Sequence, residues 1–376
     1  MPSRCVARSL ALLVTVAASP PAPAQQSAPG ERLRIGVAGL THSHVHWLLG
    51  RGDRGDVEIV GIAEPDRDLA ERYVVRHGLP ESLLYPDLES MLDAASPEAV
   101  AAFGTIREHL AVVEACAPRG IHVMVEKPLA VSLDHALRMA ALARQHGIHL
   151  LTNYETTWYG SNRRVRELVQ DGTLGEIRKM VVHDGHPGPV AIGVEQEFLE
   201  WLIDPYHNGG GALTDFGCYG ADLMTWLMGG ERPTRVTAVT QQLQPELYPE
   251  VEDEATVVVT WPRAQGIIQA SWNWPQSRKD THVYGQKGYA KALDPTRLRL
   301  RLGDGDERSL EAPAPEAPHD DPFAYLDAVV RGRENPGSHG LSSLDLNLTV
   351  MEILDAAKRS AESGTTVELP PEPPSR

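Results

Sequence analysis

Short, almost continuously apolar segments recur between residues 32 and 154, and this feature constrains the fold more than any other. Such segments are buried on both faces, as parallel strands covered by helices on either side must be. Stretches with helical spacing separate them, and one of these helices is well marked, since Ser132 can cap its start and Gly147 can end it. The alternation predicts a doubly wound parallel sheet. We expect its strands at residues 33–38, 57–63, 99–103, 121–125 and 148–151.

The pattern changes after Tyr154, where the apolar segments become longer, are rich in Val, Thr and Trp, and are joined by short Gly or Pro turns. This is typical of antiparallel strands. We expect strands at 235–243, 254–261, 266–274, 281–293 and 297–302, and helices that start at Asp321 and over 343–360. The chain is thus predicted to be an α/β protein. A Rossmann domain over 32–154 would precede an α/β domain with a largely antiparallel open sheet over 155–369 and a tail over 370–376.

The first 24 residues have the pattern of a secretory signal peptide. Arg4 and Arg8 precede an apolar run over 9–18, and small residues at Ala22 and Ala24 form a cleavage signal. The run is about half as long as a membrane span requires. We therefore expect an exported protein, periplasmic or extracellular, with no membrane span. The formal net charge of −16 would repel a phosphate backbone, so no nucleic-acid partner is expected.

The turn after the first strand only partly matches the dinucleotide fingerprint G-x-G-x-x-G. Gly39 fits its first position, whereas Thr41 and His44 stand in place of the other two glycines. Glu64 ends the second strand, where an acid holds the ribose hydroxyls of NAD and repels the 2′-phosphate of NADP. This favours NAD over NADP. Alternatively, Glu64 is a solvated acid in a turn, and Arg67 is near enough in sequence to pair with a phosphate.

Clusters of histidines raise the question of a metal site. His42, His44 and His46 alternate at the mouth of a helix, where such side chains point to different sides, and no nearby Cys or carboxylate completes a ligand set. We expect no metal there and interpret the segment as a variant phosphate loop. His183 and His186 are expected to line a substrate cleft, the alternatives being a metal site or plain surface polarity.

Two motifs carry the predicted chemistry. Glu126 and Lys127 follow the strand expected at 121–125, and open α/β sheets bind ligands beyond the carboxyl ends of their strands, so Lys127 should point into a cofactor cleft. In the glycine-rich segment 209–222, Asp215 and Tyr219 would share one face of a helix. An ammonium beside a tyrosine favours its anion, which can then accept a hydroxyl proton. Lys127 is thus predicted to activate Tyr219, with Asp215 orienting the hydroxyl. The alternative is a surface lysine and a core tyrosine.

These motifs resemble the Gfo/Idh/MocA oxidoreductase family, and the resemblance extends over 33–369. It rests on segments 126–128, 172–177, 209–222 and 284–288. It implies a Rossmann domain followed by an open-sheet domain, a bound NAD or NADP, and sugar-like or polyol substrates. By position, Lys127 matches the family's catalytic lysine and Asp215 its substrate-binding aspartate. Tyr219 stands where many members carry histidine, and His109 matches a histidine that commonly follows a T-P-N segment.

The expected site residues form two sets. The cofactor-binding set is Gly39, Thr41, His42, His44, Glu64, Glu126, Lys127 and Asn153, and the substrate-binding set is His109, His183, His186 and Asp215. The catalytic residues would be Lys127, Tyr219 and Asp215. The sequence departs from the family at the turn and at 104–106, where Gly-Thr-Ile replaces T-P-N.

We expect an exported NAD(P)-dependent oxidoreductase that acts on the CH–OH groups of a sugar, polyol or sugar derivative by hydride transfer. One alternative is a glycoside hydrolase or lyase in which a tightly bound NAD oxidises the substrate transiently. Another is a carbohydrate-binding protein that has lost turnover, which the altered turn favours and the intact Lys127, Asp215 and Tyr219 oppose. A homo-oligomer that forms through the open sheet is also expected.

Overall fold

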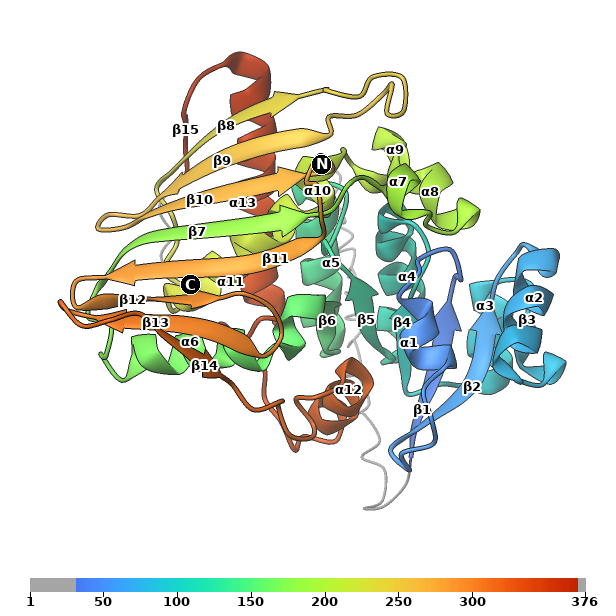
Figure 1. Cartoon of the computed structure of the whole chain (residues 1–376). Helices are drawn as coiled ribbons and strands as arrows, with labels where there is room; N and C mark the ends of the chain where they lie inside the picture. Colours follow the sequence, from blue (N-terminus) through green and yellow to red (C-terminus); the bar gives the residue numbers. More distant parts are fainter. Residues whose placement is uncertain (1–31, 371–376) are drawn as a thin grey trace, which may run out of the picture.

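The computed structural model describes residues 32–370, so the predicted signal peptide over 1–24 and almost all of the predicted tail lie outside the described residues. Two sheets lie side by side (Figure 1). The first is fully parallel, with strand order β3-β2-β1-β4-β5-β6, and confirms the predicted doubly wound sheet. Its strands are β1 (Leu33–Ala38), β2 (Val57–Ala63), β3 (Leu84–Tyr85), β4 (Ala99–Ala102), β5 (His122–Glu126) and β6 (Leu150–Asn153).

Helices cover both faces of the parallel sheet. On β1, Leu33, Ile35 and Val37 face one helical layer, while Gly36 faces the other and lets Met91 approach closely. The first layer is α1 (Val45–Leu49), α2 (Arg67–His77) and α12 (Pro322–Val330), and the second is α3 (Leu88–Ala95), α4 (His109–Cys116) and α5 (Leu133–His146). Helix α12 comes from late in the chain, so the C-terminal segment completes the Rossmann layer. Short 3₁₀ turns are η1 (Glu81–Leu83), η2 (Ile106–Glu108), η3 (Ala117–Arg119) and η4 (Glu155–Trp158).

The second sheet is mixed, with strand order β14-β13-β12-β11-β7-β10-β9-β8-β15. Only the pair β7 and β10 is parallel, so the predicted largely antiparallel sheet is confirmed. Its strands are β7 (Ile177–Gly185), β8 (Arg235–Gln241), β9 (Glu254–Thr260), β10 (Gln265–Ser271), β11 (Arg278–Gly285), β12 (Gly288–Ala292), β13 (Arg297–Leu302), β14 (Arg308–Glu311) and β15 (Val367–Glu368). The single strand predicted over 281–293 is wrong, because a turn at Gln286 and Lys287 divides it into a hairpin. Strand β7 was not predicted.

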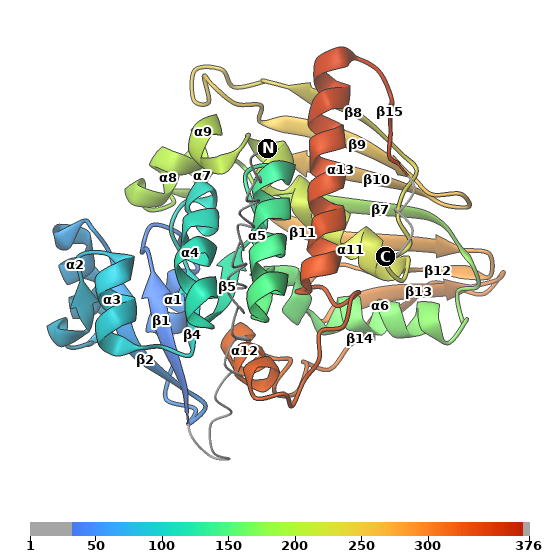
Figure 2. The same ribbon diagram turned by 180° about the vertical axis from the view of Figure 1, so that it is seen from behind.

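Helices α6 (Gly160–Gln170), α11 (Gly217–Leu227) and α13 (Leu344–Ser363) lie on one face of this sheet (Figure 2). The opposite face, turned to the viewer in Figure 1, carries no helix of the described chain. Short helices α7 (Pro189–Ile192), α8 (Gln196–Leu202), α9 (Pro205–Asn208) and α10 (Ala212–Asp215) connect β7 to α11 and extend towards the Rossmann domain. Among the described residues, no helix combines the length and apolar character needed to cross a membrane.

Candidate active site

Charged and polar side chains from both domains meet between the two sheets, and most of them are buried. They come from the carboxyl ends of β5 and β6, from β7 and β11, and from the junction of α10 and α11. The group comprises Glu126, Lys127, Asn153, Glu155, Asp184, Asp215, Tyr219, Trp272 and Lys279. A buried charge is tolerated only when it is paired and hydrogen-bonded, so the pairing within this group determines its chemistry.

Lys127 and Asp215 form the central pair. The Lys127 ammonium donates to Oδ1 of Asp215 and, over 3.2 Å, to its main-chain oxygen, while Oδ2 accepts the Trp272 indole N–H at 3.0 Å. Burial raises the pKa of Asp215, but the Lys127 charge and these hydrogen bonds outweigh it and bring the pKa below its usual value. Burial lowers the pKa of Lys127, and Asp215 reverses that shift. Both groups are therefore charged at neutral pH.

The expected partnership of Lys127 with Tyr219 is wrong. Lys127 Nζ lies 5.4 Å from the centroid of the Tyr219 ring, whereas the Tyr219 hydroxyl accepts a hydrogen bond from the Lys279 ammonium at 3.4 Å. The prediction that Asp215 and Tyr219 share one helix is also wrong, because α10 ends at Asp215 and α11 begins only after Phe216. Burial raises the pKa of Tyr219 well above its usual value, and the Glu155 carboxylate raises it further. Tyr219 is therefore a protonated phenol in this site.

Lys279 and Glu155 form a second ion pair that sequence reasoning missed. Lys279 Nζ lies 2.5 Å from Oε2 of Glu155, and the other oxygen of Glu155 accepts the Tyr159 hydroxyl. Burial raises the pKa of Glu155, but Lys279 and Tyr159 reduce it to about 2. The signal that could have found Lys279 is strand pairing, since Lys279 lies opposite Asp184 on β7. That strand was not predicted, so its partner could not be placed.

The three predicted substrate-binding histidines lie in different places. His183 points to the opposite face of the sheet, where its ring nitrogen lies 2.9 Å from Asp280, so the prediction that it lines the cleft is wrong. Alternation along β7 instead turns Asp184 towards the site. His186 lies next to Asp215 and packs edge-on against Phe216.

His109 is buried behind the Lys127 loop, with its Nδ1 3.2 Å from the Leu129 carbonyl. Burial lowers its pKa to about 4. The neutral ring therefore braces the loop after β5.

The turn after β1 is built on Gly39, whose φ of +78° is open to glycine. A Cβ there would lie 2.6 Å from the main-chain nitrogen of Gly104, the residue that opens the segment replacing T-P-N. Glu64 accepts the main-chain N–H groups of Leu40 and Asp66, each at 2.9 Å, so its carboxylate braces the turn. Each oxygen keeps a lone pair that a ribose hydroxyl can use.

Glu126 lies beside the histidines of the turn. Its oxygens accept the Asn153 amide at 2.7 Å and contact Nδ1 of His44 at 2.8 Å. Contrary to the sequence argument, a carboxylate thus accompanies His42 and His44, and the three could surround a metal ion. However, Nδ1 of His42 accepts the His44 main-chain N–H, which assigns the proton to Nε2. A metal-bound imidazole needs a lone pair at that nitrogen, so the arrangement opposes a metal.

The turn fits a nicotinamide dinucleotide. Thr41 Oγ1 and His42 Nε2 are buried there without a hydrogen-bond partner, and Glu64 stands at the end of β2. Helix α8 covers the turn, because Glu195 at its start contacts Ser43 and His46 at 3.0 and 3.2 Å. When bound, such a cofactor would supply or accept hydride, and these residues would hold it.

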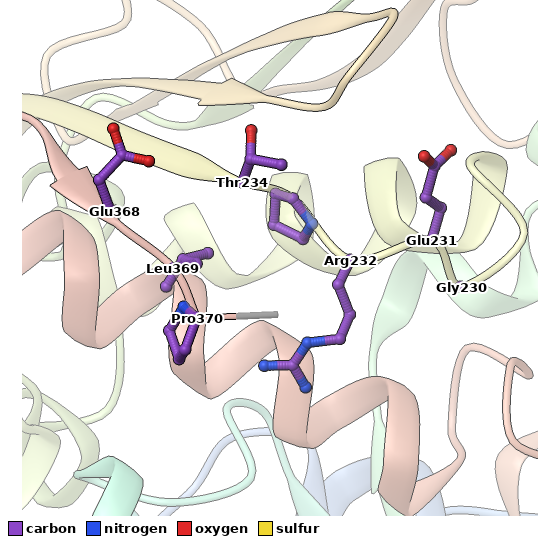
Figure 3. A pocket seen from close by; sticks show the side chains of 8 residues that line it. Gly230, Glu231, Arg232, Thr234, Glu368, Leu369 and Pro370 are labelled. Atoms are coloured by element: carbon purple, nitrogen blue, oxygen red, sulfur yellow. The ribbon is translucent and has the colours of Figure 1, made fainter. Parts of the chain in front are cut away.

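A hollow of about 320 Å³ leads to the Lys279 and Glu155 pair. It is lined by Trp47, Glu155, Trp158, Tyr159, Pro295, Asp320, Asp321 and Pro322. A larger hollow of about 520 Å³, drawn in Figure 3, lies between the loop after α11 and β15. None of the site residues described above lines it. Of these two hollows, the smaller one borders Glu155, and we call it the entrance hollow.

Comparison with known families agrees with this geometry. Residues 33–154 match the family described as an oxidoreductase family with an NAD-binding Rossmann fold, and residues 162–291 match the GFO/IDH/MocA C-terminal domain. Together these matches cover more than half of the chain. The chain belongs to the Gfo/Idh/MocA oxidoreductase family.

Individual Gfo/Idh/MocA relatives are distant but nearly full-length. Trans-1,2-dihydrobenzene-1,2-diol dehydrogenase of Sus scrofa is 28% identical over 303 residues, 79% of this chain and 84% of the relative. D-apiose dehydrogenase of Paraburkholderia graminis is 25% identical over 352 residues, 89% and 88% of the two chains. An inositol dehydrogenase homolog from Azotobacter vinelandii, crystallised with NAD⁺, has a TM-score of 0.77 at 19% identity and covers 90% of this chain and 98% of its own. The predicted family, fold and enzyme class are confirmed.

The Lys127 and Asp215 pair yields a prediction for stability. Lys127→Met would leave Asp215 buried without its cation and should lower the free energy of unfolding by about 3–5 kcal/mol. Adding Asp215→Asn removes the stranded charge and should restore part of the loss, as measured by urea unfolding. Lys291→Met, which removes a more exposed ion pair with Glu307, is the control and should cost less than about 1 kcal/mol. A double variant no more stable than Lys127→Met would contradict the pairing.

Proposed function

We propose that this protein is an exported NAD-dependent oxidoreductase that interconverts an alcohol and a carbonyl on a sugar, polyol or related diol. The observation that carries the proposal is the buried pair of Lys127 and Asp215, after the carboxyl end of β5, together with the protonated Tyr219, whose ring centroid lies 5.4 Å from Lys127 Nζ. A positioned acid next to fixed charges is what alcohol and carbonyl chemistry requires.

The entrance hollow supports a polyhydroxylated substrate. Trp47, Trp158 and Tyr159 offer flat apolar surfaces, while Glu155 and Asp321 offer carboxylate acceptors for hydroxyl groups. The relatives named for a dihydrodiol and for D-apiose support the same class, since both substrates carry adjacent hydroxyls. We therefore propose a small vicinal diol or sugar as substrate.

Each residue of the site has a proposed task. Asp215, fixed by Lys127 and Trp272, would accept a hydrogen bond from a substrate hydroxyl next to the reacting carbon. Tyr219 would exchange a proton with the reacting oxygen. Glu64 would bind the adenosine ribose and thereby favour NAD over NADP.

The cover formed by α8 favours a cofactor that is held tightly. Glu195 accepts a hydrogen bond from Ser43 in the turn, and Phe198 packs edge-on against His42 with the ring centroids 4.9 Å apart. Tight retention suits an exported enzyme, because free nicotinamide cofactor is scarce outside the cytoplasm. It also keeps open a glycoside hydrolase or lyase reaction through transient oxidation. Assembly through the uncovered face of the nine-stranded sheet stays a prediction.

The cofactor proposal is tested by denaturing the purified mature protein and identifying what it releases. We expect a nicotinamide dinucleotide, predominantly NAD. Glu64→Gln keeps the size of the side chain but removes the charge that repels a 2′-phosphate. The difference in affinity between NAD and NADP should therefore be smaller in this variant. Titration calorimetry of stripped protein with both dinucleotides measures the preference. Equal affinities in the unmodified protein would contradict the role of Glu64.

Catalysis is tested by Tyr219→Phe, which removes one hydroxyl from a buried ring. A positioned acid or base contributes about 10²- to 10⁴-fold, so turnover should fall by that factor while cofactor binding stays unchanged. The assay follows nicotinamide absorbance across a panel of aldoses, polyols and cyclic diols. Tyr206→Phe, which removes the hydroxyl of an exposed tyrosine on α9, is the control. Full activity in Tyr219→Phe would move the proton chemistry to another group.

Export is tested at the amino terminus. If signal peptidase cleaves after Ala24, protein recovered from the periplasm or medium should begin at Gln25. Amino-terminal sequencing of that fraction gives the answer. Recovery of an uncleaved chain from the cytosol would overturn the proposal.

A further inference from the structure

Two carboxyl groups among the described residues are fully buried and have no hydrogen-bond partner on either oxygen. They are Asp184 on β7 and Asp222 on α11. A carboxylate in that state would forgo both water and any donor, a cost of several kcal/mol. A carboxylic acid forgoes much less, so both side chains are protonated in the folded protein. Burial raises the pKa of each well above its usual value.

Asp184 differs from Asp222 in what it faces. Asp184 is the register partner of Lys279 across the antiparallel pair of β7 and β11, which places the two side chains next to each other on one face of the sheet. Lys279 in turn lies 3.4 Å from the Tyr219 hydroxyl. Asp222 faces Tyr154 and Cys218, and no ammonium acts on it. Of the two acids, only Asp184 therefore lies opposite a proton-carrying group that reaches the Tyr219 hydroxyl.

The charges around Asp184 balance only when it is neutral. The groups that act on it are Lys279 from β11, Glu155 and Tyr159 from the segment after β6, Lys127 from the loop after β5, and Asp215, Cys218 and Tyr219 from α10 and α11. Two ammonium groups there match two carboxylates, Asp215 and Glu155. An ionised Asp184 would add a third negative charge, fully buried and without a cation of its own.

We propose that Asp184 is a stored proton for Tyr219, delivered through Lys279, and that the resting site is set for reduction of a carbonyl group. This rests on the proposed function, which supplies hydride from a reduced nicotinamide dinucleotide. As hydride adds to the carbonyl carbon, the Tyr219 O–H bond breaks and its proton goes to the carbonyl oxygen. The phenolate then takes a proton from the Lys279 ammonium, and Lys279 takes one from the Asp184 carboxyl. The product is an alcohol, and Asp184 is left as a carboxylate beside the Lys279 cation until water returns its proton.

The first test needs neither substrate nor cofactor. Infrared spectroscopy of the purified protein at neutral pH should show protonated carboxyl groups, and Asp184→Asn should remove part of that signal. Asp222→Asn, matched in burial and in lack of partners, should remove a separate part. A protonated-carboxyl signal unchanged in Asp184→Asn would overturn the proposal, whatever the enzyme's substrate proves to be.

The pH dependence of stability gives a second, independent measurement. A group whose pKa is raised on folding contributes stability that is full below its unfolded pKa, near 4, and is lost as the pH rises. Asp184→Asn escapes that loss, so its midpoint of urea unfolding should rise relative to the unmodified protein between pH 4 and 7. An ionised Asp184 paired with Lys279 would give the opposite trend and overturn the proposal.

The relay itself is tested by comparing carbonyl reduction with alcohol oxidation. The assay uses the substrate found in the panel on which Tyr219→Phe is tested. In Asp184→Asn, the first turnover of carbonyl reduction should be retained, because Tyr219 still holds its proton, while later turnovers should slow about tenfold or more. Alcohol oxidation should change less, and Asp222→Asn should change neither direction. Equal effects on both directions, or none, would leave Asp184 as a buried neutral side chain without a part in proton delivery.

Discussion

The site depends on one constraint, the burial of charged side chains. Each buried ion must be paired with an opposite charge from elsewhere in the chain. The Lys127 ammonium meets Asp215, which lies 88 residues away, and Lys279 meets Glu155 across 124 residues. Breaking a buried pair costs several kcal/mol, far more than one surface contact contributes. The central pair joins the Rossmann domain to the second domain, so the electrostatics of the site also hold the two sheets in position.

The sequence predicted best those elements whose burial leaves a clear period. Strands β1 and β2 lie where they were expected, since strands covered on both faces appear as nearly continuous apolar runs. Strand β7 escaped notice because Arg178 and Lys179 interrupt its alternation with two successive exposed polar residues. The sequence analysis predicted one strand where β11 and β12 form a hairpin. The apolar pattern continues on both sides of the turn, and the turn residues resemble those of the strands.

The sequence predicted which three residues gather at the site, but not which of them contact each other. Lys127, Asp215 and Tyr219 do come together, yet sequence spacing does not reveal which of two lysines reaches a given hydroxyl. That choice depends on the break between α10 and α11 and on the register of β11 against β7. The same register explains why Asp184 faces the site in place of the predicted His183, since a strand presents neighbouring residues to opposite faces.

Exclusion of water has a consequence for proton transfer that the ion pairs alone do not show. In an open cleft, bulk water would restore the proton that Tyr219 gives up, and no internal donor would be needed. Here Tyr219 is 1% exposed and its hydroxyl contacts the Lys279 ammonium at 3.4 Å, so the proton that it gives up returns through a side chain. A neutral acid next to Lys279 meets that need without adding a charge to the interior. The burial that makes the ion pairs strong thus also favours a stored proton, and Asp184, opposite Lys279, is placed to hold one.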